Sequence, residues 1–74
     1  MPVQSILFER YKNNGKKYWS TLHARRWLKS HGFVYDQFVD KKPGVLRFRQ
    51  YNPKPMARYS TKKLGDGIML VIDH

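Results

Sequence analysis

The sequence predicts an α+β fold in which a small antiparallel sheet of three to four strands packs its apolar face against one helix. Three observations lead to this prediction. Apolar residues recur at three- and four-residue spacing within 20–30, which indicates an amphipathic helix. Apolar and basic residues alternate over 45–51, which is typical of a strand with one buried face. Residues that favour turns separate these segments. A chain of 74 residues is expected to form a single domain, 1–74.

The first expected element is a strand over 3–8, because this segment is largely apolar and contains β-branched residues. Residues 11–17 follow as a turn, since Asn13, Asn14 and Gly15 tolerate the backbone conformations that a turn requires.

The helix is expected to begin after a cap at Ser20 or Thr21, whose hydroxyl can accept a hydrogen bond from a backbone N–H of the first turn. It should run to about residue 30. Gly32 is placed to end it in the left-handed conformation, and Phe33 would then pack back on the helix near Leu28. The expected apolar face consists of Ala24, Trp27, Leu28 and His31.

The remaining chain predicts further strands and the turns between them. Residues 56–63 favour no single assignment. The last strand is apolar on both faces, which predicts a central position in the sheet or cover from the helix. The strands are expected over 33–39, 45–51 and 68–72, with turns at 40–44 and 64–67.

The charge of the chain is one-sided, with 15 bases, five acids and a formal net charge of +10. Residues 10–35 contain seven bases and no acid, and residues 41–65 contain eight bases and no acid. Such a surface repels itself in the compact state, and a polyanion is the commonest partner that compensates. The charge therefore predicts a nucleic acid or an acidic protein surface as the partner.

The strand at 45–51 carries the most specific candidate residues. Arg47 and Arg49 should project from one face, roughly 6.5–7 Å apart by strand geometry. That separation resembles the spacing of successive phosphates along one strand of a nucleic acid. Tyr51 shares their face and would add a stacking surface. In the alternative interpretation the two arginines are only solvated and Tyr51 packs at a sheet edge.

Other basic residues form smaller groups that support this interpretation. Lys16 and Lys17 precede two aromatic residues, an arrangement found in single-strand binders, although Trp19 is also well placed to be a core residue. The helix presents three bases that a solvated surface would explain equally well. The full candidate set is Lys16, Lys17, Arg25, Arg26, Lys29, Arg47, Arg49, Tyr51, Lys62 and Lys63.

Catalysis, metals and cofactors are not predicted. The five carboxylates are scattered, and no nucleotide-binding loop is present. His23 and His31 are about two helical turns apart, too far to share a metal ion. Without cysteine, a signal peptide or an apolar run of about 20 residues, the chain is expected to be intracellular and to have no membrane partner.

Three segments together resemble a small domain found in proteins of tailed bacteriophages and large DNA viruses. They are Trp27-Leu28-x-x-His31-Gly32-Phe33, then Arg47-Phe48-Arg49-Gln50, and Lys63-Leu64-Gly65-Asp66-Gly67-Ile68. This resemblance brings no catalytic or binding residue to the chain. It implies a virus-encoded protein, present in the virion or in the host cytoplasm or nucleus.

The sequence therefore predicts a non-enzymatic binding module that contacts the phosphates of DNA or RNA with little sequence specificity. The alternative is a small virion, minor capsid or assembly protein whose basic faces dock on acidic protein surfaces. A single continuous surface of Arg47, Arg49, Lys16, Lys17 and Arg25 would favour the first, and evenly spread bases would weaken it.

Overall fold

The computed structural model describes residues 2–36 and 39–74. Within these residues the chain forms one helix, α1 (Thr21–Ser30), and a five-stranded antiparallel sheet. The order across the sheet is β2-β3-β1-β5-β4. The α+β class is confirmed, and the sheet has more strands than the three to four predicted. The strands are β1 (Val3–Glu9), β2 (Val39–Lys42), β3 (Val45–Arg49), β4 (Tyr59–Gly65) and β5 (Ile68–Asp73).

Helix α1 begins where its cap was predicted. The Ser20 hydroxyl accepts a hydrogen bond from the backbone N–H of His23 at 3.2 Å. Its extended backbone conformation is the one that an N-cap residue adopts.

The end of α1 also follows the prediction. Gly32 has a φ of +77°, and its N–H donates to the carbonyl of Lys29 at 3.3 Å. The N–H of Phe33 donates to the carbonyl of Leu28 at 2.9 Å, which completes a Schellman motif. The Phe33 ring stacks on Trp27, with ring centroids 5.9 Å apart, and this contact directs the chain back over the helix.

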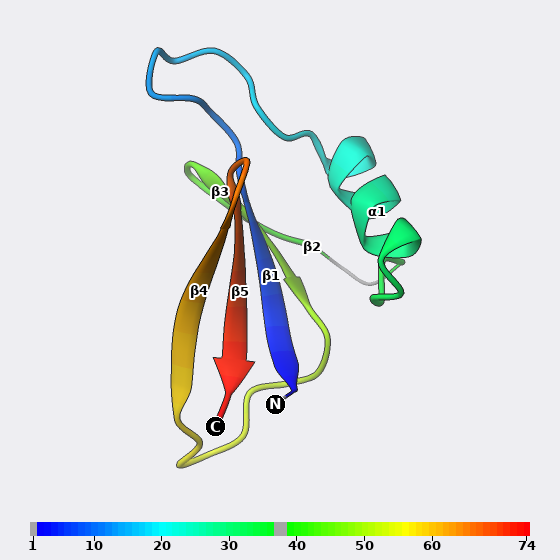
Figure 1. Cartoon of the computed structure of the whole chain (residues 1–74), viewed down its shortest axis with the longest axis vertical. Helices are drawn as coiled ribbons and strands as arrows, with labels where there is room; N and C mark the ends of the chain where they lie inside the picture. The colour runs from blue at the N-terminus through cyan, green and yellow to red at the C-terminus, as the bar shows by residue number, and fades with distance from the viewer. Residues whose placement is uncertain (1, 37–38) are drawn as a thin grey trace.

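The core lies between α1 and one face of the sheet (Figure 1). Phe8 of β1 is fully buried at the centre of the core. Its ring centroid lies 5.0 Å from that of Trp19, 5.7 Å from that of Trp27 and 5.6 Å from that of Phe48. Burying one such side chain contributes about 1.5–3 kcal/mol. The buried apolar residues are Ile6, Phe8, Ala24, Leu28, Val39, Leu46, Phe48 and Ile68.

The strand predicted over 33–39 is wrong for most of its length, because β2 begins only at Val39. The backbone of Val34 is satisfied by a side chain instead of a neighbouring strand. Gln50 accepts from the N–H of Val34 at 2.8 Å and donates to its carbonyl at 3.1 Å. Residues 37 and 38 of that predicted strand lie outside the described residues.

The hairpin between β2 and β3 is tighter than predicted. Lys42 pairs with Val45, so the predicted turn over 40–44 shrinks to Pro43 and Gly44. Gly44 has a φ of +103°, a backbone conformation that favours glycine.

Strand β4 occupies much of the segment that favoured no assignment. It is an edge strand and is mostly exposed, so it shows no alternation of apolar and polar residues. The turn predicted over 64–67 narrows to Asp66 and Gly67, with φ values of 52° and 75°. Two positive φ values are typical of a type I′ hairpin turn. Strand β5 has the central position predicted for it, between β1 and β4.

The two ends of the chain lie together at one end of the sheet, opposite the loop that follows β1 (Figure 1). The backbone N–H of Asp73 donates to the carbonyl of Pro2 at 2.9 Å. No helix formed by residues 2–36 and 39–74 has both the length and the apolar character needed to cross a membrane.

Candidate nucleic-acid interface

The predicted binding residues of β3 lie on the face of the sheet that α1 does not cover. Leu46 and Phe48 are buried toward the helix, so the alternating Arg47 and Arg49 project from the opposite face. Both arginines are partly buried. The prediction that Arg47 and Arg49 share one face of the strand is consistent with this structure. That face, however, is on the opposite side of the sheet from the basic residues of the helix and of the loop before it. The candidate set therefore does not form one continuous surface.

Arg49 also has an acidic neighbour that the charge pattern did not predict. Its Nε lies 3.3 Å from a carboxylate oxygen of Asp40 on the adjacent strand β2. The contact is an ion pair without the alignment of a hydrogen bond. Asp40 lies just outside the acid-free stretch over 41–65, and in the folded protein it offsets part of the positive charge on this face.

Tyr51 is occupied by contacts within the protein. Its hydroxyl donates to a carboxylate oxygen of Asp73 at 2.6 Å, and the Lys54 ammonium lies 5.4 Å from its ring centroid. The hydrogen bond to Asp73 is the main cause that raises the pKa of Tyr51 to about 12, with a smaller contribution from burial. These contacts fit the alternative interpretation, in which Tyr51 packs against the protein at a sheet edge instead of offering a free stacking surface.

Among the bases of α1, Arg25 has a role in packing. Its guanidinium donates to the carbonyl of Tyr35 and lies 5.5 Å from the ring centroid of Phe48. Lys29 lies 5.6 Å from the ring of Tyr35, while Arg26 is exposed. Arg25 therefore helps to hold the segment after the helix against the core.

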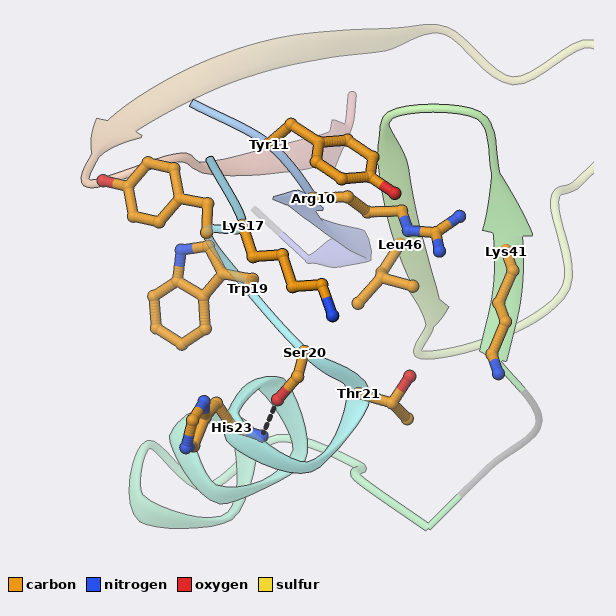
Figure 2. Close-up of a pocket in the computed structure, with 10 residues that line it drawn as sticks. Arg10, Tyr11, Lys17, Trp19, Ser20, Thr21, His23, Lys41 and Leu46 are labelled. Atoms are coloured by element: carbon orange, nitrogen blue, oxygen red, sulfur yellow. Dashed lines mark hydrogen bonds between the residues drawn. The ribbon is translucent and has the colours of Figure 1, made fainter. Parts of the chain in front are cut away.

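A cleft of about 370 Å³ opens where the loop after β1, the start of α1 and the β2–β3 hairpin meet. Three bases line it: Arg10 and Lys17 from the loop after β1, and Lys41 from β2. Figure 2 shows their charged ends around the same hollow. The ten described residues that line it include no acid. The other lining residues are Tyr11, Tyr18, Trp19, Ser20, Thr21, His23 and Leu46.

Arg10 is fixed in this cleft by hydrogen bonds to the hairpin. Its guanidinium donates to the carbonyl of Lys42 at 3.1 Å, and its backbone N–H donates to the carbonyl of Gly44 at 2.9 Å. A guanidinium has five N–H donors, so one bond to Lys42 leaves further donors to contact an anion. The hydrogen bonds set the position of Arg10 before any ligand arrives.

The loop that carries Lys17 is also ordered by its own backbone. Tyr11 and Lys17 form an antiparallel bridge across its base. The N–H of Lys12 donates to the carbonyl of Lys16 at 2.8 Å, and Gly15 supplies a φ of +81° at the tip. A loop held in this way loses little conformational entropy when it binds a ligand.

The wall of the cleft opposite the bases is aromatic. The indole N–H of Trp19 donates to the carbonyl of Asp66 at 2.7 Å, and its ring packs on Phe8, so Trp19 is a core residue. Burial raises the pKa of Tyr18, and the charges of Asp66 and Glu9 raise it further. Neither acid is among the residues that line the cleft.

The structure brings one predicted residue, Lys17, together with three that sequence reasoning missed: Arg10, Tyr11 and Lys41. Arg10 lies in the acid-free stretch over 10–35 and Tyr11 begins the predicted turn over 11–17, but neither was chosen as a binding residue. Lys41 fell in a predicted turn. Lys16 lies exposed on the same loop as Lys17, whereas Lys62 and Lys63 lie on β4 at the far edge of the sheet.

Comparisons with known proteins give no further assignment. No protein-family model, no curated protein and no solved structure matches this chain. Within residues 2–36 and 39–74, no three His, Asp or Glu side chains gather into a group that could hold a metal ion.

Proposed function

We propose that this protein is a non-enzymatic module that binds nucleic acid through its phosphates, with little sequence specificity. The observation that carries the proposal is the cleft in which Arg10, Lys17 and Lys41 meet without an acidic neighbour in its lining. A phosphate placed in this cleft would be attracted by all three cations, and hydrogen bonds between charged groups are stronger than those between neutral groups. The net charge of +10 attracts a polyanion over a longer range.

Low sequence specificity follows from the kind of contact. Phosphate contacts are the same for every sequence, whereas specificity needs side chains that reach the edges of bases. Helix α1 has its N-terminal turn in the cleft and packs its apolar face on the sheet, so it is not presented as a recognition helix for a DNA groove.

The test is a titration of labelled nucleic acid by fluorescence anisotropy at several salt concentrations. If the protein contacts about five to eight phosphates, log Kd should change with log salt with a slope of roughly 0.9 per contact for duplex DNA. Absence of binding at low salt, or tight binding with a flat salt dependence, would overturn the proposal.

A pair of matched variants locates the interface. Lys17→Gln with Lys41→Gln removes two charges from the cleft, and Lys62→Gln with Lys63→Gln removes two from the far edge of the sheet. The cleft pair should lower affinity for all sequences and reduce the salt slope by about two. The edge pair should have a clearly smaller effect. Equal effects would mean that only net charge matters and that the cleft is not the interface.

The alternative function, docking on an acidic protein surface in a virion or assembly complex, has one supporting observation. This observation is the face of the sheet that α1 does not cover. Leu7, Met69 and Val71 are partly exposed there beside Arg47. A virion or assembly partner that used this face would bind independently of the cleft. Arg47→Gln should then weaken that partner's binding, while the two cleft substitutions should leave it unchanged.

A further inference from the structure

Tyr11 places an exposed aromatic ring at the edge of the cationic cleft (Figure 2). The side chain is 48% exposed, although its backbone is fixed by the bridge to Lys17. The Arg10 guanidinium lies 5.8 Å from its ring centroid. This tyrosine contributes little to the core, since it is neither one of the buried core residues nor one of the partly buried residues packed against them.

An aromatic ring beside a group of basic side chains offers two complementary contacts to a nucleotide. The basic side chains attract the phosphate, and the aromatic ring stacks on the nucleobase. Stacking requires a nucleobase with a free face. Bases inside a duplex are stacked on their neighbours, whereas the bases of a single strand can turn outward and stack on a protein ring.

The cleft is large enough for this arrangement. Its volume of about 370 Å³ lies within the usual range for sites that enclose a small ligand or one unit of a larger one. Such a hollow excludes the body of a duplex, which could present only its outer phosphates to the rim.

We infer that the cleft receives one nucleotide of a single-stranded nucleic acid, with its phosphate among Arg10, Lys17 and Lys41 and its base stacked on Tyr11. The inference rests on the proposed function and specifies its substrate as a single strand. The contacts read neither the base edges nor the 2′-hydroxyl, so both single-stranded DNA and single-stranded RNA carry the required chemistry.

The first experiment compares oligonucleotides with equal numbers of phosphates. Wild-type protein is titrated with a single-stranded DNA, the matching RNA, a duplex and an abasic single strand that keeps its phosphates but lacks bases. The base-bearing single strands should bind at least several-fold more tightly than the duplex and the abasic strand. Either order of DNA and RNA supports the inference and identifies the preferred source.

The second experiment uses Tyr11 and a matched control. Tyr11→Ala should weaken single-strand binding by about 5- to 150-fold, the range for loss of one stacked base, and leave duplex binding nearly unchanged. Tyr11→Phe should retain binding. The control, Tyr35→Ala, removes a tyrosine that is 37% exposed and, like Tyr11, has a cation near its ring, here Lys29, but does not line the cleft.

The outcomes separate this inference from the proposed function. Salt-dependent binding with equal affinity for single strand, duplex and abasic strand would keep the proposed function and overturn the inference. A Tyr11→Ala effect that is equal for single strand and duplex would also overturn it. Lack of binding to every nucleic acid at low salt would overturn both. The abasic comparison uses unmodified protein, so it decides the matter even if Tyr11→Ala fails to fold.

Discussion

Gly67→Ala should destabilise the fold more than the backbone conformation of Gly67 alone explains. Gly67 has a φ of +75°, and a Cβ there would lie 2.8 Å from Cε2 of Tyr18. The positive φ costs an alanine about 1–2 kcal/mol. The overlap with Tyr18 adds roughly 1–3 kcal/mol, because that ring is stacked on Trp19 and cannot move without disturbing it. The expected loss in free energy of unfolding is therefore about 2–5 kcal/mol, from a total of roughly 4–11 kcal/mol for a chain of this size.

Gly32 supplies the matched control for this prediction. Its φ of +77° is almost the same, but a Cβ there would meet no atom within 4 Å. Gly32→Ala should therefore cost only the conformational part, about 1–2 kcal/mol. Urea unfolding followed by tryptophan fluorescence measures both, and each kcal/mol should lower Tm by about 4–8 °C.

A double-mutant cycle then isolates the steric part. In a Tyr18→Ala background the ring is gone, so Gly67→Ala should cost no more than Gly32→Ala. If Gly67→Ala and Gly32→Ala are equally destabilising in the wild-type background, the packing of Tyr18 on Gly67 has no energetic role and the argument fails. If Tyr18→Ala leaves the cost of Gly67→Ala unchanged, the loss has another origin.

Three further predictions concern the core, the helix cap and the alkaline limit of stability. Phe8→Ala should cost about 3–5 kcal/mol in chemical unfolding, since it leaves a cavity among three aromatic rings; a loss below 1 kcal/mol would contradict the description of the core. Ser20→Ala should cost about 1 kcal/mol, and Ser20→Asp should restore it, as measured by thermal unfolding. Tyr51 has its pKa raised from 10.0 to about 12, so the stability from its hydrogen bond to Asp73 is present below pH 10 and lost as the pH rises to about 12. Wild type should therefore lose more free energy of unfolding across that interval than Tyr51→Phe, and equal losses would contradict this assignment.

The helix was predictable because all of its signals are local. Ser20 as the cap and Gly32 at the end act on backbone groups within a few residues, so sequence spacing alone identifies them. Strand β4 was not predictable in the same way. It lies at an edge with most side chains in solvent, so no buried face imposes alternation on its sequence.

The candidate site was predicted only in part, because some of its residues are brought together by tertiary structure and not by their position in the sequence. Lys17 was identified from its neighbours in the sequence, but Lys41 joins it only through the order of strands in the sheet. Arg49 shows the reverse case: its charge is visible in the sequence, while its pairing with Asp40 depends on the register between β2 and β3. Local composition predicts which residues carry charge, and tertiary structure decides which charges meet.

The adjacency of the two chain ends has a practical and an evolutionary consequence. Pro2 and Asp73 share a hydrogen bond at the end of the sheet opposite the loop that follows β1 (Figure 1), and that loop lines the cleft. A tag, a surface anchor or a fused domain at either terminus would therefore start from the same place and leave the cleft open. Close termini also allow a domain to be inserted into a loop of another protein with little distortion of its host.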